Sequence, residues 1–452
     1  MNTPDKSVNA WIFLDEDEPS GSSYKSPDSC YQSLSRHGVY HATDILDICF
    51  FVTVPTGAKT VPPGDGSSYT IEIGNISMKH PDGSTNLQYL QWLIDDARKS
   101  RPGIKLLATL GYGSNELSNI FSNTARSEQQ NAENFAANLL ACLQQYDLDG
   151  FDVDWEFPLD TSITQGQFSV LFNAIHTRFN SQPARHYFLT LSPASVGNLD
   201  PATVNDCFDF LNLQLYSGFT DPSEFISRGI RKELLAYGAK FESIGNGNPA
   251  PFQDAQNACQ GYVNGDYNAL TQWRLNSGNF QFEQAQQIIL YQLLNPSTDG
   301  RFDDTLAIGA AGNPPITGLV VRTGNVLDSI QATNTGEYSG VTLNYTLPQH
   351  GGNGGTETVI AIPPGDAITN ISGYSGTWFG WQCVLQITLK TRQGKVLGPF
   401  GSMDHATSKT PFSTSVPPGQ SIVAFSGTTV KVPQASGGST EIIATLNATC
   451  SL

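Results

Sequence analysis

The chain has 452 residues, of which 39% are hydrophobic and 14% are charged, and its formal net charge is −17. This length exceeds one ordinary core, so we expect two or three globular domains and exclude a disordered chain or a coiled coil. The negative charge disfavours nucleic acids and anionic membranes as partners; it suits a neutral or cationic substrate, or serves solubility alone. No apolar run approaches the roughly 18 residues of a membrane helix, so we expect no membrane insertion.

Between residues 7 and 295, short apolar runs alternate with longer amphipathic stretches. Helical spacing marks Ser127–Tyr146, which opens on a Ser127/Gln130 capping box, and Phe280–Leu294. Eight strands alternating with helices predict an α/β fold, a (β/α)₈ TIM barrel. The runs interpreted as strands are Val8–Leu14, Ile45–Val54, Ile104–Leu110, Leu148–Phe157, Tyr187–Ser192, Phe208–Tyr216, Leu234–Phe241 and Leu270–Leu275.

Beyond Asn295 the helical periodicity disappears, and Gly, Pro, Asn and Ser separate short β-type runs. This pattern predicts an all-β sandwich, prism or barrel. We therefore expect a catalytic barrel over residues 1–295, a linker over 296–302 and an all-β domain over 303–452. The β-type runs are Gly318–Val321, Asp328–Ala332, Gly340–Leu347, Thr358–Ile362, Val384–Thr391, Ser421–Phe425 and Glu441–Leu446.

The seven cysteines are scattered and never fall in C-x-x-C spacing. They indicate neither a disulfide framework nor a zinc site, and we expect no metal or cofactor.

The strongest chemical signal is Leu148–Pro158, with the sequence LDGFDVDWEFP. Because side chains on a strand alternate between faces, Asp152, Asp154 and Glu156 share one face and the apolar residues between them share the other. In a barrel the acidic face would point inward, where stability alone would favour Val or Ile. Glu156 comes last, at the carboxyl end of the strand, where barrel active sites lie.

Three acids this close cannot all be ionised cheaply, so at least one pKa must rise. A protonated Glu156 could donate to a leaving oxygen, while Asp152 and Asp154 would share a proton or orient one another. Two other interpretations compete. One is an acidic strand face in solvent, and the other is a calcium loop beginning at Gln145, with Glu156 at its twelfth position.

The stretch Asp149–Glu156 resembles the D-G-x-D-x-D-x-E signature of family 18 glycoside hydrolases, the chitinases and endo-β-N-acetylglucosaminidases. Three weaker elements occur in the right order. Lys105–Tyr112 resembles the third-strand S-x-G-G element, Gln214-Leu215-Tyr216 resembles the sixth-strand M/Q-x-Y element, and Trp273 matches the tryptophan beneath the reacting sugar. The resemblance covers nearly all of residues 7–295.

The resemblance implies a retaining mechanism without a carboxylate nucleophile. The N-acetyl oxygen of the substrate attacks the anomeric carbon and gives an oxazolinium ion. Glu156 would protonate the leaving group and then activate water, Asp154 would hold the N-acetyl group, and Asp152 would tune Asp154.

The same resemblance implies substrate contacts at the ends of other strands. The Tyr216 hydroxyl would bind the acetamido group, and Trp273 would stack beneath the sugar, helped by Gln214 and Tyr112. The alternatives are a strand-end aromatic for Tyr216 and a barrel-core tryptophan for Trp273. Ser217 departs from the family, which usually has Asp or Asn there.

Only residues 242–269 separate the expected seventh and eighth strands. That is too short for the α+β insertion that walls the cleft of processive chitinases. We therefore expect an open groove and internal cleavage.

The second domain resembles jacalin-type lectins, whose fold is a β-prism of three small sheets. The G-x-x-x-D loop of that family is expected at Ser426–Val432, which contains no Asp, so the usual monosaccharide site is not expected there. Trp378 and Trp381, together with Phe379, suit stacking on sugar rings; the alternative is ordinary packing. The elements that carry the resemblance are Ile316–Gln331, His350–Gly355, Ile368–Tyr374, Gly398–Gly401 and Ile422–Phe425.

Three functions follow from these features. The first is a monomeric hydrolase of chitin, favoured by Trp155 between the last two acids; the second is an endo-β-N-acetylglucosaminidase acting on N-glycans. The third is a non-catalytic chitinase-like lectin, against which the presence of Glu156 argues. Residues 1–10 are polar and contain no signal-peptide core, so either the sequence is that of the mature form, or export uses another route, or the protein stays inside. Of these we expect an extracellular protein, secreted by a route that is not visible in the sequence.

Overall fold

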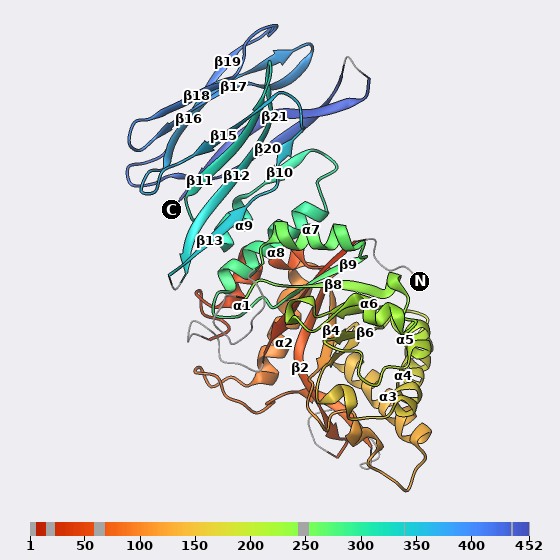
Figure 1. The fold of residues 1–452 in the computed structure, drawn as a ribbon. Coiled ribbons are helices and arrows are strands. Elements are labelled where there is room, and N and C mark those ends of the chain that lie inside the picture. The colour runs from red at the N-terminus through yellow and green to blue at the C-terminus, as the bar shows by residue number, and fades with distance from the viewer. Residues whose placement is uncertain are drawn as a thin grey trace. The chain divides into compact units, whose positions relative to one another are not determined.

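The computed structural model describes residues 6–14, 23–57, 68–242, 253–338, 340–434 and 437–451. The chain forms two compact units, one built from residues up to 283 and one from residues beyond it, with 254–256 assigned to the second (Figure 1). Within the described residues, no helix combines the length and the apolar character needed to cross a membrane.

The first unit is a closed barrel of eight parallel strands, which confirms the predicted fold. The sheet order is β1-β9-β8-β7-β6-β5-β4-β2, and a β1–β2 pairing closes it. An additional strand, β3 (Tyr69–Ile73), pairs antiparallel with the end of β2 and was not predicted. The barrel strands are β1 (Ser7–Phe13), β2 (Ile45–Pro55), β4 (Lys105–Leu110), β5 (Gly150–Trp155), β6 (Phe188–Pro193), β7 (Phe210–Leu213), β8 (Leu235–Lys240) and β9 (Ala269–Trp273).

A helix follows each barrel strand. The capping box of α3 is confirmed, because the Ser127 hydroxyl accepts from Gln130 N at 3.2 Å and the Gln130 side chain accepts from Ser127 N at 3.0 Å. Between β8 and β9, the described residues form one helix, α7. The helices are α1 (Cys30–Arg36), α2 (Asn86–Ser100), α3 (Glu128–Gln145), α4 (Gln165–Asn180), α5 (Pro201–Cys207), α6 (Pro222–Ser227), α7 (Ala255–Gly265) and α8 (Phe280–Leu294).

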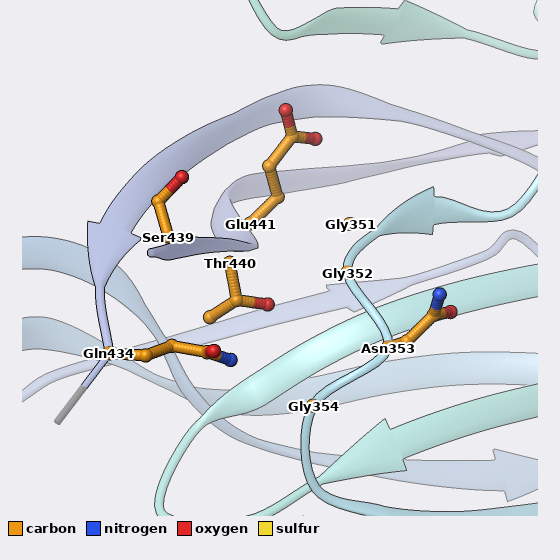
Figure 2. Close-up of a pocket in the computed structure, with 8 residues that line it drawn as sticks. All are labelled: Gly351, Gly352, Asn353, Gly354, Gln434, Ser439, Thr440 and Glu441. Atoms are coloured by element: carbon orange, nitrogen blue, oxygen red, sulfur yellow. The ribbon is translucent and has the colours of Figure 1, made fainter. Parts of the chain in front are cut away.

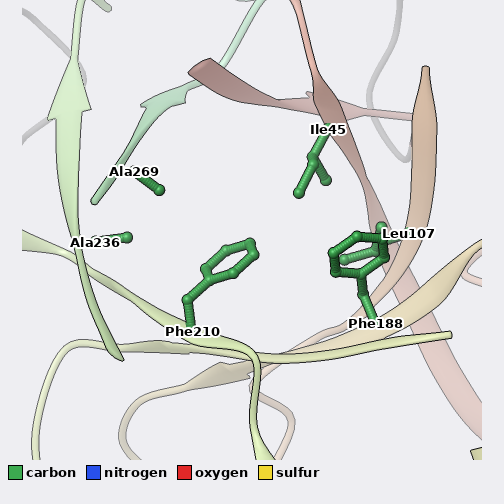
Figure 3. Packing of buried hydrophobic residues seen from close by; sticks show 6 residues of the cluster. All are labelled: Ile45, Leu107, Phe188, Phe210, Ala236 and Ala269. Carbon is green, nitrogen blue, oxygen red and sulfur yellow. The ribbon is translucent and has the colours of Figure 1, made fainter. Parts of the chain in front are cut away.

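The barrel interior is layered. Six buried side chains from six strands meet near the amino ends of the strands and form an apolar floor (Figure 3). The next inward position lies two residues further along a strand; in five of these six strands it holds a buried polar residue, and in β8 it holds Gly238. The floor consists of Ile45, Leu107, Phe188, Phe210, Ala236 and Ala269; the polar layer includes Asp47, Thr109, Asp152, Thr190, Asn212 and Thr271.

The second unit contains three antiparallel sheets and has the β-prism fold of jacalin-like lectins, as predicted. A short helix, α9 (Thr305–Ala310), contradicts the expectation that helical structure ends near Asn295. The first sheet contains β10 (Arg301–Asp303), β20 (Ile422–Pro433) and β21 (Ser439–Cys450). The second contains β13 (Val341–Thr346), β12 (Leu327–Tyr338), β11 (Ile316–Thr323) and β15 (Thr356–Ala361), with β14 (His350–Gly351) on β12. The third contains β18 (Val396–Gly401), β17 (Trp381–Thr391), β16 (Ile368–Trp378) and β19 (Thr410–Ser415).

Candidate active site

Strand β5 carries the acidic motif with the predicted alternation. Asp152 and Asp154 are 0% and 6% exposed, and Glu156 follows the strand end, where it is partly exposed. The intervening residues face the helices: the Phe151 ring lies 6.4 Å from Phe135 of α3, and the Trp155 ring lies 5.2 Å from Phe168 of α4. Burial of the two aspartates rules out an acidic face in solvent. A calcium loop is ruled out as well, because Asp149 and Glu156 lie at opposite ends of one extended strand.

Asp152 is held by two hydroxyl groups of β6. Thr190 Oγ1 donates to Asp152 Oδ1 at 2.7 Å, and Ser192 Oγ lies 3.0 and 2.9 Å from the two carboxylate oxygens. Burial raises the pKa of Asp152 to about 6, while these hydroxyl groups oppose the rise by stabilising the ionised form. The register of β5 on β6 pairs Asp152 with Thr190 and Asp154 with Ser192, which accounts for these contacts.

Asp154 lies between Gln214 and Glu156. Gln214, directly after β7, donates from Nε2 to Asp154 Oδ1 at 2.8 Å and to Ser192 O at 3.0 Å, which fixes the orientation of its amide. Burial, followed by the charges of Glu156 and Asp152, raises the pKa of Asp154 well above its usual range. Burial and the two neighbouring carboxylates therefore favour the protonated form of Asp154.

Glu156 accepts a hydrogen bond from the carboxyl group of Asp154. Burial raises the pKa of Glu156, and this hydrogen bond partly opposes the rise. The sequence analysis paired Asp154 with Asp152, whereas the structure directs the hydrogen bond of Asp154 to Glu156. Such a pair can deliver a proton to a group at the barrel mouth and take one back.

Tyr216 lies in a short 3₁₀ turn, Leu215–Ser217, after β7. Burial, followed by the negative charges of Asp154 and Glu156, raises the pKa of Tyr216 well above its usual range. The tyrosine therefore stays neutral and lies close enough to Asp154 and Glu156 for their charges to raise its pKa. The structure thus brings together Glu156, Asp154, Asp152, Gln214 and Tyr216.

Aromatic residues lie at the carboxyl ends of neighbouring strands. Trp273 ends β9, with its ring 5.6 Å from Trp11 and 6.2 Å from Phe50. Tyr112 is 46% exposed and meets the Phe50 ring edge-on at 6.3 Å. Phe50 therefore links the two predicted sugar-binding aromatics. The sequence analysis missed it because it lies inside a continuous apolar run with no alternation.

Asp47 of β2 is a second residue that the sequence analysis missed. It is 0% exposed, and neither carboxylate oxygen has a hydrogen-bond partner among the described residues. Burial and then the charge of Asp152 raise its pKa well above the usual range, which favours its protonated form. The available signal was a single acid inside the apolar run Ile45–Val54.

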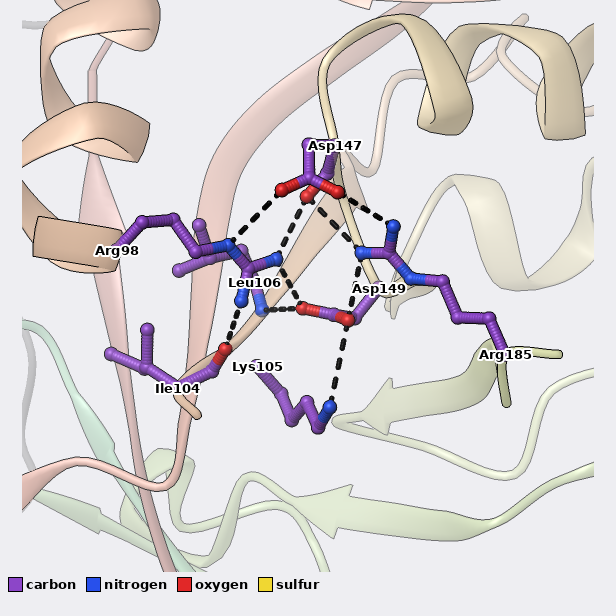
Figure 4. Close-up of polar contacts among 7 residues, drawn as sticks. All are labelled: Arg98, Ile104, Lys105, Leu106, Asp147, Asp149 and Arg185. Atoms are coloured by element: carbon purple, nitrogen blue, oxygen red, sulfur yellow. Dashed lines mark hydrogen bonds and ion pairs between the residues drawn. The ribbon is translucent and has the colours of Figure 1, made fainter. Parts of the chain in front are cut away.

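Asp149, the first acid of the motif, lies at the opposite end of β5 from Glu156. Its carboxylate meets Arg98 at 2.6 Å, Arg185 at 2.8 Å and Lys105 at 3.7 Å (Figure 4). Burial alone would raise its pKa, but the hydrogen bond from Leu106 N and the two arginines hold the pKa below its usual value. Asp149 therefore ties β5 to its neighbours and takes no part in the acid cluster.

The motif glycine, Gly150, is required by strand spacing. A Cβ there would lie 2.4 Å from Phe188 O on β6, which is closer than any side chain tolerates.

In the second unit, Trp378 and Trp381 face each other across the β16–β17 hairpin. Both are partly buried against the hydrophobic cluster that contains Cys383 and Leu385. Phe379 at the turn is 65% exposed, and its ring stacks on His405 at 5.6 Å. The exposed aromatic surface therefore belongs mainly to Phe379.

The stretch Ser426–Val432 lies inside β20, so the expectation that it forms the family's binding loop was wrong. The segment that faces the glycine-rich element follows β20. A hollow of about 370 Å³ separates them, which we name the glycine hollow (Figure 2). Its lining residues are Gly351, Gly352, Asn353, Gly354, Gln434, Ser439, Thr440 and Glu441.

The barrel with its buried acids, and the three-sheet prism, together define a carbohydrate-active protein. The model of the glycosyl hydrolases family 18 matches residues 35–273, and that of the jacalin-like lectin domain matches residues 297–435. The chain belongs to glycosyl hydrolases family 18 and carries a jacalin-like lectin domain.

Curated relatives match over short segments. An endochitinase of Brugia malayi is 37% identical over 86 residues, covering 19% of this chain and 16% of that protein. Chitinase 1 of Aphanocladium album is 23% identical over 150 residues, covering 31% of this chain and 33% of that protein. The matched segments thus span a third or less of these relatives.

Solved structures match each unit separately. Human YKL-39, described as a pseudo-chitinase with retained chitooligosaccharide binding, is 12% identical over 64% of this chain and 98% of that chain, with a TM-score of 0.44. A galactose-binding lectin from Champedak is 24% identical over 34% of this chain and 99% of that chain, with a TM-score of 0.25.

Proposed function

We propose that the barrel is a retaining, endo-acting glycosidase that hydrolyses β-1,4-linked N-acetylglucosamine, with chitin as its substrate. The observation that carries this proposal is the acid pair at the barrel mouth: Asp154 donates its proton to Glu156, and Tyr216 lies beside them. A proton shared by two carboxyls at a partly exposed site suits the protonation of a glycosidic oxygen.

In the proposed reaction, the proton that Asp154 donates to Glu156 moves to Glu156 and leaves Asp154 ionised. Glu156 gives this proton to the glycosidic oxygen while the bond from that oxygen to the anomeric carbon breaks. The N-acetyl oxygen of the substrate forms a bond to the same carbon and gives an oxazolinium ion. Asp154 accepts a hydrogen bond from the acetamido N–H and stabilises the positive charge, and the Tyr216 hydroxyl donates to the acetamido oxygen. Glu156 then takes a proton from water. The water oxygen bonds to the anomeric carbon while the bond from the acetamido oxygen to that carbon breaks, so the oxazolinium ring opens with net retention.

Asp152, as an ionised neighbour, favours the protonated form of Asp154 and so keeps the proton in the pair. Trp273 and Tyr112 supply faces on which sugar rings stack. The Ser217 hydroxyl is 3.1 Å from Thr220 Oγ1, so the position where the family usually has Asp or Asn forms a local bond. Internal cleavage fits the short β8–β9 connection.

The enzymatic proposal is tested with a fluorogenic chitobioside. Glu156→Gln should lower kcat by at least roughly 10²–10⁴-fold. Glu133→Gln, on the exposed side of α3, is the matched control and should leave kcat unchanged. Equal activity of the wild type and Glu156→Gln would refute the role of Glu156. Binding of chitooligosaccharides without any turnover by the wild type would favour the non-catalytic lectin.

The second candidate, an endo-β-N-acetylglucosaminidase, uses the same acids and differs in its substrate. Turnover of colloidal chitin is therefore compared with release of glycans from an N-glycoprotein. Soluble chitooligosaccharides from chitin, with no glycan release, support the first proposal; the reverse result replaces it with the second.

We propose that the prism binds glycans at the glycine hollow. Its small glycines expose backbone N–H and C=O groups, and Asn353, Thr440 and Gln434 add polar side chains suited to sugar hydroxyls. Since chitin and glycoproteins occur on cell surfaces, we place the action of this monomer outside the cell.

A further inference from the structure

A second hollow, of about 320 Å³, lies in the same unit and shares Gly351 and Glu441 with the glycine hollow. We name it the linker hollow, because the segment expected to be a linker forms one of its walls. Residues that define it are Tyr291, Gln292, Asn295, Phe302, Leu306 and Gln349. No element of the acid cluster contributes to it.

Hydrogen bonds and a ring contact fix the wall of the linker hollow that β10, β20 and His350 form. Gly300 O accepts from Thr429 N at 2.8 Å, and β10 pairs antiparallel with β20. The Phe302 ring stacks on the His350 ring at 4.0 Å, and His350 Nε2 lies 2.8 Å from Asp304 Oδ1. The segment is therefore part of the prism, and the hollow exists before any ligand arrives.

The lining combines an apolar face with polar groups that lack strong charge. Tyr291, Phe302 and Leu306 supply the apolar surface. The Gln292 amide donates from Nε2 to Asp303 O at 2.9 Å, while its side-chain carbonyl is buried and has no hydrogen-bond partner in the described part of the chain.

Three charged side chains line the hollow, and each has a partner: Asp303 accepts from Thr305 N at 2.9 Å, and the other two form ion pairs. Arg301 meets Asp299 at 2.5 Å, and Glu441 meets Lys431 at 3.9 Å. Figure 2 shows the Glu441 carboxylate directed away from Thr440 and Gln434 of the glycine hollow. Thr429 Oγ1, on the lining of the linker hollow, donates to that carboxylate at 3.3 Å. Glu441 therefore borders one hollow with its backbone and the other with its side chain.

We propose that the linker hollow is a second sugar subsite, which takes a neutral ring linked to the ring held in the glycine hollow. Aromatic and aliphatic surface beside an unpaired amide oxygen suits the apolar face and the hydroxyl groups of a pyranose. The inference rests on the proposed glycan binding by the prism. A second subsite would make the prism selective for oligosaccharides over single sugars. The subsite would also need residues upstream of position 303, which form part of its lining.

The test uses the full chain with Glu156→Gln in every arm, so that no probe is hydrolysed. The probe is an array of neutral oligosaccharides of one to four rings built from galactose, mannose or N-acetylglucosamine. Asn353→Trp fills the glycine hollow and identifies which signals belong to the prism. Leu306→Trp fills the linker hollow from a position that is 44% exposed, and Leu306→Ala is its matched control. Gln292→Met removes the unpaired acceptor with little change in volume.

The expected result is that Leu306→Trp weakens prism-dependent binding of oligosaccharides at least tenfold and leaves single sugars unchanged. Gln292→Met should weaken the same oligosaccharides less, and Leu306→Ala should not reduce them. If Asn353→Trp abolishes binding while Leu306→Trp has no effect on any chain length, the second subsite is refuted and glycan binding by the prism stands. If no signal depends on Asn353, both proposals fail.

Discussion

Replacing Ser192 with alanine tests whether the support of Asp152 controls the reaction. The Ser192 hydroxyl lies 3.0 and 2.9 Å from the two oxygens of Asp152, and its removal leaves the hydrogen bond from Thr190 Oγ1 at 2.7 Å in place. A hydrogen bond to a charged group contributes about 1.5–3 kcal/mol, and one pKa unit corresponds to about 1.4 kcal/mol. Because the hydroxyl favours the ionised carboxylate, its loss should raise the pKa of Asp152 by about one to two units above its present value of about 6.

The assay is the pH dependence of kcat/KM on the fluorogenic chitobioside. If the reaction needs an ionised Asp152, the acidic limb of the profile should move to higher pH by about one to two units in Ser192→Ala. Thr271→Val is the control, since the Thr271 hydroxyl donates to Asn212 in the same polar layer. An active, folded Ser192→Ala with an unmoved acidic limb would refute the role of Asp152, and an equal shift in Thr271→Val would assign the effect to packing.

Two further predictions concern stability. The pKa of Asp47 is raised in the folded state. Above the pKa of an unfolded aspartate, near 4, the wild type should therefore lose stability relative to Asp47→Asn as the pH rises. The loss is at most about 1.4 kcal/mol per pH unit. Urea unfolding at two pH values measures this, and a difference independent of pH contradicts it. Asp149 has a lowered pKa, so its contribution is present at neutral pH and is lost as the pH falls below about 4. Asp149→Asn should destabilise the neutral protein by about 2–4 kcal/mol, somewhat below a fully buried pair because Arg98 and Arg185 remain partly exposed; no loss at neutral pH would show that the ion pairs contribute little.

The periodicity of the apolar residues, and the alternation of predicted strands with predicted helices, were sufficient to predict the barrel. Strand β5 and helix α8 carry strong alternation and strong helical spacing, and α3 begins at its own capping box. These signals are local, because each depends on side chains within one or two turns. The inward direction of Asp152 and Asp154 follows from the same alternation once the strand is placed in a closed barrel.

The residues that the sequence analysis missed depend on contacts between distant segments. The alternation of side chains along β5 shows which of its faces is acidic, but it does not show which hydroxyl groups of β6 lie opposite that face. That depends on register, and register placed Thr190 and Ser192 beside Asp152. In β2 the burial alternates from Phe50 onward, but Phe50, Phe51 and Val52 are all apolar, so the residue types do not mark which of them faces the mouth.

The layered interior explains how the barrel accommodates so many acids. The apolar floor and the ion pairs of Asp149 stabilise the amino end of β5, while the polar layer above supplies hydroxyl and amide donors to the carboxylates. A chain with Val at position 190 and Ala at position 192 would keep the acidic motif unchanged. Its Asp152 would lose the hydroxyl donors of Thr190 and Ser192, which favours the protonated carboxyl group. With Asp152 neutral, the proton shared by Asp154 and Glu156 would no longer be favoured by a neighbouring charge. The proposed hydrolysis therefore depends on the hydroxyl groups of β6 as well as on Glu156.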